Sequence, residues 1–185
     1  MNFHQSSLRW LAVLLLSLLW ATMGSAAALA ERGNFRQSSL AAKGAPLAGS
    51  IRTVNPSFPA AGFNQNCVNC VIATEQRFAG VAGATARSSA GPLPITNIAG
   101  EFGGSFQNVS GMMEIGSILS KSGNGARGIV FGADSARGFG HVWNVRIDNG
   151  VVRFLDSQPA GRAGLGVGNF DDFTDFQFLL TSPGR

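Results

Sequence analysis

The dipeptide Asn149-Gly150 lies between two runs of alternating apolar and polar residues, one ending at Asp148 and the next beginning at Val151. Asn-Gly readily adopts the positive φ angles of a two-residue turn, and between two such runs it is the strongest short-range signal for a β-hairpin. Pairing across this turn places Val145 opposite Phe154 and buries one apolar face, whereas a three-residue loop would place an arginine opposite Val145. The sequence therefore predicts a two-residue hairpin between strands His141–Asp148 and Val151–Asp156.

The same register brings together two residues that can do chemistry. Carried outward from the turn, it places Trp143 opposite Asp156 and His141 opposite Gln158, all on one face. His141 and Asp156 are then diagonal neighbours, with Cα atoms expected about 7–8 Å apart. A carboxylate that accepts from one imidazole nitrogen fixes the tautomer, so that the other nitrogen can take a proton from a thiol. A hydrogen-bonded histidine without a catalytic role is the alternative for this pair taken alone.

Both cysteines lie in a second motif, Asn66-Cys67-Val68-Asn69-Cys70, at the predicted start of a helix that stops near Gly80. Cys67 falls in the first turn, directly after Asn66, which is a favourable N-cap residue. Cys70 lies about one turn deeper and is expected to point toward the core. A helix N-terminus and a nearby imidazolium both favour the reactive thiolate form, so this helix and the hairpin together have the layout of a papain-like cysteine enzyme.

The remaining elements define the fold class. Phe106–Lys121 is predicted to be an amphipathic helix, Gly128–Gly132 a short strand and Phe173–Leu180 a final strand, while Val81–Pro94 is rich in loop-forming residues. Helices come first and antiparallel strands follow. This order predicts an α+β fold in which the cysteine-bearing N-terminal helix packs on an antiparallel sheet that carries His141 and Asp156.

The N-terminal residues have the pattern of a secretory signal peptide. An apolar run from Trp10 to Trp20 is followed by small residues and by an A-x-A site ending at Ala30. The apolar run is shorter than a membrane-spanning helix requires. We therefore expect residues 1–30 to be cleaved after Ala30, 31–52 to form a flexible arm and 53–185 to form one domain. The mature protein is expected to be secreted or periplasmic and not bound to a membrane.

Composition limits the classes of ligand. The formal charge of +4 falls to +3 without the first thirty residues, and the basic residues are scattered singly, so no nucleic-acid partner is expected. Two cysteines and His141 fall short of the four ligands of a structural zinc site. We therefore predict no metal and no cofactor.

The two motifs together resemble a known family. Asn-Cys-Val-Asn-Cys-Val-Ile-Ala-Thr-Glu, preceded by Asn55-Pro56, and the later Gly-His-Val-Trp-Asn-Val and Asp-Ser-Gln runs resemble the papain-fold toxin domain (Tox-PL type) of bacterial polymorphic toxins, predicted protein-glutamine deamidases. The resemblance extends over roughly Val54 to Ser182. It implies a papain-like fold, a protein substrate with a reactive glutamine side chain, and an immunity protein as a candidate partner.

The resemblance also assigns roles to residues. Cys67 corresponds to the nucleophile, His141 to the base and Asp156 to the residue that orients it, while Gln158 matches a glutamine with a structural or substrate-positioning role. Cys70 is the alternative nucleophile, because the second cysteine of C-x-x-C is catalytic in papain-type proteases. Backbone amides at the helix start, with Asn66 or Gln65, are candidate oxyanion donors.

Three functions therefore compete. The first is a cysteine-dependent amidohydrolase that deamidates protein glutamine, with a peptidase or a transglutaminase using the same triad as alternatives. The second is a redox or disulfide-stapled binding module, since C-x-x-C at a helix start also serves dithiol oxidoreductases. The third is a secreted interaction domain of the same fold with an inactive site.

Overall fold

The computed structural model describes residues 51–159, 164–165 and 173–184, all of which fall in one unit of the chain, Ser38–Arg185. The predicted signal peptide and residues 31–50 of the predicted arm lie outside the described residues. Within the described part, none of the helices has the length and apolar character needed to cross a membrane.

Four helical segments and six strands make up the described fold. The helical segments are η1 (Ile51–Thr53), a short 3-10 helix, and the α-helices α2 (Cys67–Phe78), α3 (Thr96–Phe102) and α4 (Met112–Lys121). The strands are β1 (Gln107–Val109), β2 (Arg127–Asp134), β3 (Phe139–Asp148), β4 (Val151–Asp156), β5 (Gly164–Leu165) and β6 (Asp175–Ser182).

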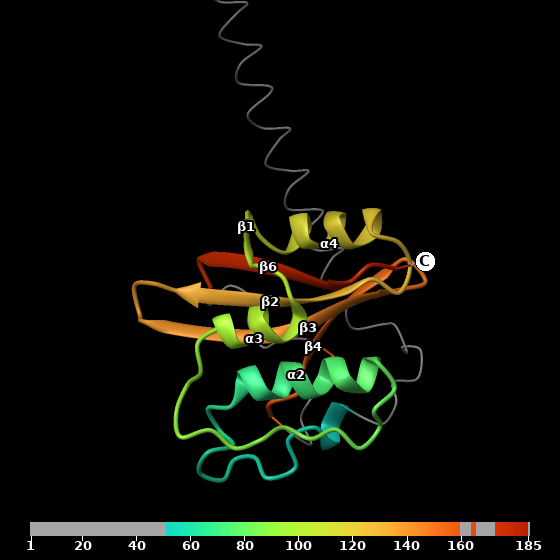
Figure 1. Cartoon of the computed structure of the whole chain (residues 1–185). Coiled ribbons are helices and arrows are strands. Elements are labelled where there is room, and N and C mark those ends of the chain that lie inside the picture. The colour runs from blue at the N-terminus through green and yellow to red at the C-terminus, as the bar shows by residue number, and fades with distance from the viewer. Residues whose placement is uncertain (1–50, 160–163, 166–172, 185) are drawn as a thin grey trace, which may run out of the picture. The chain divides into compact units, whose positions relative to one another are not determined.

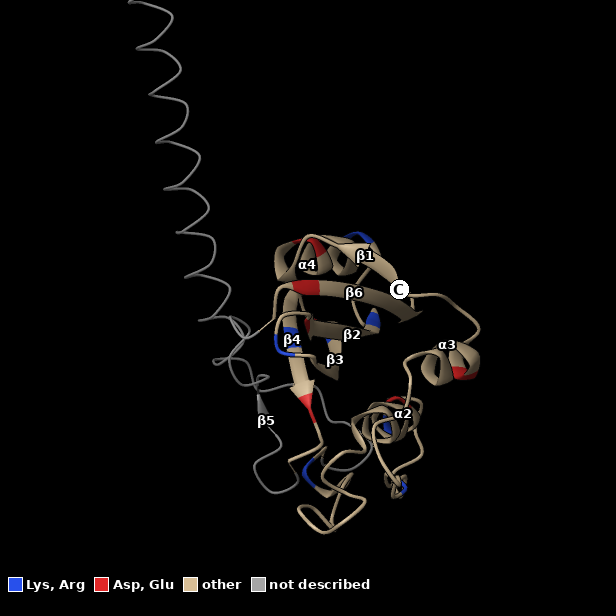
Figure 2. Cartoon of the chain, turned by 90° about the vertical axis from the view of Figure 1, so that its left-hand side faces the viewer, with Lys and Arg blue, Asp and Glu red and all other residues tan. Residues whose placement is uncertain are grey.

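The strands form one sheet in the order β1-β6-β2-β3-β4-β5, and every neighbouring pair is antiparallel. Helices α2 and α3 lie on one side of this sheet and α4 on the other (Figures 1 and 2). The predicted α+β class, with the cysteine-bearing helix packed on an antiparallel sheet, is confirmed.

The β3–β4 hairpin has the predicted turn and register. Asn149 and Gly150 both have positive φ angles, 50° and 77°, as a two-residue hairpin turn requires. Asp148 pairs with Val151 and Val145 pairs with Phe154. The alternative three-residue loop is therefore wrong. The register is the one in which the apolar residues Val145 and Phe154 face each other.

Apolar and polar contacts both hold α2 on the sheet. Val68 and Val71 are buried with apolar residues of β2, β3 and β6. Beside them the buried carboxylate of Glu75 accepts hydrogen bonds from Arg127 at 2.8 Å and Asn144 at 3.1 Å. Burial raises the pKa of Glu75 even though the Arg127 charge opposes the shift. This contact fixes the position of α2 along the sheet and so the place of its N-terminus.

One predicted element is wrong. Residues 106–121 were expected to form one helix, but Gln107–Val109 is edge strand β1 and the helix begins only at Met112. Gly111, with φ 144°, breaks the helical path between them, and both the backbone N–H and the hydroxyl of Ser110 donate to the Glu114 carboxylate. The short helix α3 was not predicted at all.

Candidate active site

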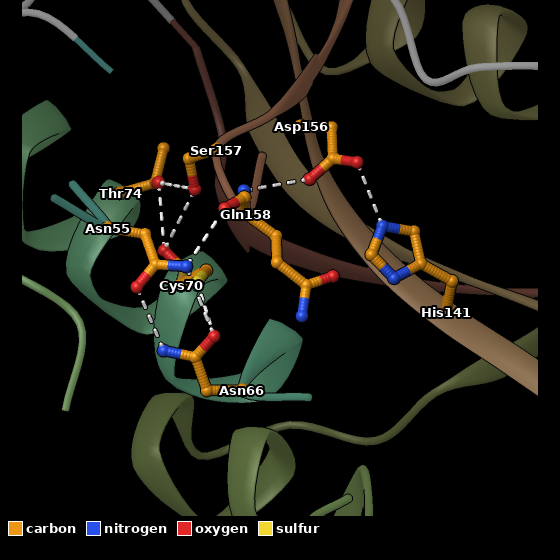
Figure 3. A network of polar contacts seen from close by, with 8 residues as sticks. All are labelled: Asn55, Asn66, Cys70, Thr74, His141, Asp156, Ser157 and Gln158. Atoms are coloured by element: carbon orange, nitrogen blue, oxygen red, sulfur yellow. Dashed lines mark hydrogen bonds and ion pairs between the residues drawn. The ribbon is translucent and has the colours of Figure 1, made fainter. Parts of the chain in front are cut away.

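The start of α2 and the adjacent ends of β3 and β4 meet at one place (Figure 3). His141 Nε2 lies 3.0 Å from Asp156 Oδ2, and their side chains are only 13% and 15% exposed. The other carboxylate oxygen, Asp156 Oδ1, accepts the backbone N–H of Gln158 at 3.0 Å. Both oxygens of Asp156 are therefore held, and the proximity of His141 and Asp156 predicted from the hairpin register is confirmed.

The pKa of His141 reflects Cys67 as well as Asp156. Burial lowers the pKa of His141, but hydrogen bonds to Asp156 and Cys67 and the negative charges of these two groups outweigh it and raise the pKa to about 10. Because Nε2 faces Asp156, Nδ1 is the nitrogen left for the thiol. An imidazolium that persists at neutral pH favours a thiolate beside it.

We expect removal of the Asp156 charge to lower the pKa of His141. In Asp156→Asn the pKa should fall by roughly 1–3 units, the usual size of such a charge effect, and NMR titration of the imidazole carbons measures it.

In the wild type, the folded-state pKa of His141, about 10, lies above the ordinary value of 6.5. The imidazolium therefore stabilises the wild-type fold fully below about pH 6.5, and this contribution is lost as the pH rises through about 10. An unchanged pKa in Asp156→Asn would contradict the assigned pairing.

The two cysteines occupy different environments. Cys67 is partly exposed at the helix start, whereas Cys70 is 1% exposed and packs in the core with Val54 and Leu155. Burial, followed by the negative charges of Asp156 and Cys67, raises the pKa of the Cys70 thiol. Cys70 is therefore held as a thiol. Of the two candidate nucleophiles, these environments favour Cys67.

Asn66 does not cap α2 with its side chain, contrary to the prediction. Its Nδ2 instead donates to Asn55 Oδ1 at 3.1 Å and to the Arg87 carbonyl at 3.0 Å, and its Oδ1 accepts from Asn55 Nδ2 at 3.2 Å. With both N–H groups engaged and 1% exposure, this side chain is not placed to serve as the expected oxyanion donor. It positions the helix start instead.

Asn55, to which the sequence assigned no role, lies at the centre of this contact network. It is fully buried, and its Nδ2 also donates to the carbonyls of Phe63 and Gln158, each at 2.8 Å. Asn55 thus joins the residue before Cys67 to the segment just after Asp156 (Figure 3). The only signal in the sequence was its place in the Asn-Pro pair that precedes the cysteine motif.

Replacing Asn55 with alanine is expected to lower the free energy of unfolding by about 2–4 kcal/mol, because it leaves buried polar partners without a hydrogen bond. Chemical denaturation measures the loss. Asn69→Ala is the matched control: its amide also bonds the Arg87 carbonyl, but on the exposed side, so we expect a loss below about 1 kcal/mol. Equal losses in the two variants would contradict the importance of the Asn55 network.

A second link joins α2 to the end of β4. Thr74 Oγ1 donates to the Cys70 carbonyl at 2.8 Å and lies 2.8 Å from Ser157 Oγ, which is itself within 3.3 Å of the same carbonyl. Gln158 follows, with its backbone anchored by Asp156 and Asn55. Figure 3 shows its partly buried side chain with no contact drawn from the carboxamide. The Gln158 carboxamide therefore lies near His141 and Asp156 and makes no hydrogen bond to the other residues drawn.

The family comparison agrees with this geometry. Residues 65–161 match the family described as papain fold toxin 1, glutamine deamidase. The chain belongs to this family. The matched region is shorter than the 54–182 expected from the sequence, yet it contains Cys67, His141, Asp156 and Gln158. Comparisons of the papain-fold chain with curated proteins and with solved structures found no match.

Membership in the papain fold toxin 1 family accounts for the architecture. The family is described as having the papain fold. In the structure, the helix with Cys67 and Cys70 packs on the antiparallel sheet. The described residues hold no group of three or more histidine, cysteine, aspartate or glutamate side chains arranged as a metal site.

Proposed function

We propose that this chain is a protein-glutamine deamidase that uses Cys67 as its nucleophile, His141 as its acid–base and Asp156 to orient the imidazole. The observation that carries the proposal is the buried His141–Asp156 pair beside the start of α2, the helix that begins at Cys67, in a chain of the glutamine deamidase family. The substrate is a protein that presents a glutamine side chain, and the reaction needs no cofactor.

The first step forms a thioester. The Cys67 thiolate attacks the carboxamide carbon of the glutamine, and the His141 imidazolium gives its proton to the departing nitrogen, which leaves as ammonia. Asp156 holds the imidazole in position through Nε2 during this transfer. The C–N bond is broken, a C–S bond is formed and His141 is left neutral.

The second step returns the enzyme to its starting state. Neutral His141 removes a proton from water, which attacks the thioester carbonyl and displaces the Cys67 thiolate. The product side chain is a carboxylate, so glutamine becomes glutamate. The imidazolium–thiolate pair is restored, and the remaining proton goes to solvent.

Backbone amides at the start of α2 are the proposed oxyanion donors. Asn66 makes no side-chain cap on this helix, so its first N–H groups point out of the helix end without that partner. Gln65 is exposed directly before the buried Asn66, and Gln158 lies between the start of α2 and His141 (Figure 3), so their carboxamides are the proposed side-chain contacts to the substrate. Asn66 itself acts by positioning Cys67.

The dithiol alternative is less well supported. Dithiol oxidoreductases place their cysteine pair after a strand in a βαβ unit, but among the described residues no strand precedes α2. The structure has no disulfide between Cys67 and Cys70, and Cys70 is buried in the core. A peptidase and a transglutaminase remain alternatives with the same three residues, and they differ from a deamidase only in the bond broken or the acceptor used.

One experiment separates these activities. Reduced protein is incubated with glutamine-containing proteins in ¹⁸O-water, and the products are mapped by peptide mass spectrometry. Deamidation predicts glutamate at former glutamines with one ¹⁸O per side chain, and no backbone cleavage. Cleaved peptides would identify a peptidase, and glutamine–lysine cross-links or amine incorporation a transglutaminase. No change in any substrate would oppose the proposal of a thiol enzyme.

We also propose that residues 1–30 are a signal peptide and that the protein acts as an exported toxin or effector. The apolar run and the A-x-A site before Glu31 support export, and the family description supports a toxin. Protein recovered from the periplasm or medium should begin at Glu31 by N-terminal sequencing; recovery beginning at Met1 would oppose cleavage. The proposed immunity protein is identified as a gene product that restores growth when residues 31–185 are expressed in the cytosol.

A further inference from the structure

A row of aromatic rings leads from His141 to the protein surface. Trp143 stacks beside the His141 ring with centroids 6.0 Å apart, Phe173 lies 5.2 Å from Trp143, and Phe139 stacks on Phe173 at 5.7 Å with an interplanar angle of 19°. Trp143 is fully buried and Phe173 is 9% exposed, but Phe139 is 51% exposed. The row therefore ends in one aromatic side chain open to solvent.

A glycine opposite His141 makes room for the buried part of this row. Gly132 pairs with His141 across β2 and β3. A Cβ at position 132 would lie 2.7 Å from Trp143 Cη2 and 2.8 Å from Phe173 Cγ, closer than packed carbon atoms approach. The absence of a side chain thus allows Trp143 and Phe173 to support Phe139 from below, so that its ring stands on a packed base.

Phe139 also lies within reach of a bound substrate. Alternation along β3 places Phe139, His141 and Trp143 on the same face of the sheet, and two residues along a strand span about 7 Å. An extended peptide covers the same distance in about two residues. A substrate whose glutamine carboxamide reaches His141 would therefore bring a residue one or two positions away close to the Phe139 ring.

Given the proposed deamidase function, we propose that Phe139 is a specificity residue that contacts an apolar side chain within two residues of the target glutamine. An exposed phenylalanine ring offers no hydrogen bond to a polar side chain of the substrate. Its burial is favourable when an apolar group of the substrate covers it. The enzyme should therefore deamidate glutamines with an apolar neighbour in preference to glutamines flanked by polar residues.

The test uses a complex mixture of peptides digested from a whole proteome. The full chain is reduced and incubated with this mixture, and deamidated glutamines are mapped by mass spectrometry for wild type, Phe139→Ser, Phe139→Leu and Val81→Ser. Val81 is the matched control, because it is also apolar and is 54% exposed, but it follows the end of α2 opposite to Cys67. Thermal unfolding confirms that each variant is folded.

The wild type and Val81→Ser should favour glutamines with an apolar residue within two positions by about tenfold, the scale of a small apolar contact in specificity. Phe139→Ser should lose this preference, measured as the ratio of apolar-flanked to polar-flanked glutamines that are deamidated, and Phe139→Leu should restore it. Deamidation without a flanking preference in the wild type, or a preference that survives in Phe139→Ser, would overturn the role of Phe139. Absence of deamidation by the wild type would instead overturn the proposed function on which this role rests.

Discussion

Replacing Cys67 with alanine is expected to reduce glutamine deamidation by at least about 10³-fold, because it removes the thiol on which the proposed thioester forms. Cys70→Ala is the matched control, since it removes a thiol from the same helix only three residues away. Cys70 is buried in the core and its pKa is raised, so its removal should affect stability more than chemistry. Ammonia release and deamidated peptides measure both activities.

The comparison decides which cysteine is the nucleophile. We expect Cys70→Ala to retain activity within about tenfold of the wild type, with a small loss of stability from the removed sulfur. If Cys70→Ala were inactive and Cys67→Ala active, the nucleophile would be Cys70 and its burial would have to be relieved by substrate binding. If both variants kept wild-type activity, the thioester mechanism would be wrong.

Alkylation of the reduced protein at pH 6 should label Cys67 much faster than Cys70. A thiol with an ordinary pKa near 8.5 is less than about 1% thiolate at this pH, so fast labelling requires a partner that stabilises the thiolate. His141 is the proposed partner, since its raised pKa, about 10, favours the positively charged imidazolium. We expect His141→Ala to slow the labelling of Cys67 by roughly 10–100-fold.

Peptide mass spectrometry locates the label, and Cys70 in the same peptide serves as the internal reference. Its labelling should be slow in both proteins, since it is 1% exposed. A rate at Cys67 that does not respond to His141→Ala would show that the two residues do not form an activated pair. Fast labelling of Cys70 alone would assign the nucleophile to that residue.

Local sequence signals predicted the hairpin and the histidine–aspartate pair correctly. Asn149-Gly150 specifies its turn through the φ angles of two adjacent residues, and pairing of near neighbours along the chain then follows from the alternation of side chains. The same local reasoning failed for residues 106–121. Apolar spacing there resembles a helix, but Gly111 and the Ser110–Glu114 contact start the helix only at Met112.

By itself the sequence determined the α+β order, the helix that begins at Cys67, and the register that brings His141 to Asp156, because each depends on residues close together in the chain. Only the tertiary structure showed that Cys70 is buried and Cys67 partly exposed, since burial depends on what packs against the helix. It alone also showed that Asn55 bonds the carbonyl of Gln158, 103 residues away. A buried hydrogen bond between such distant residues has no local pattern, because its energy depends on desolvation and geometry that exist only in the folded chain.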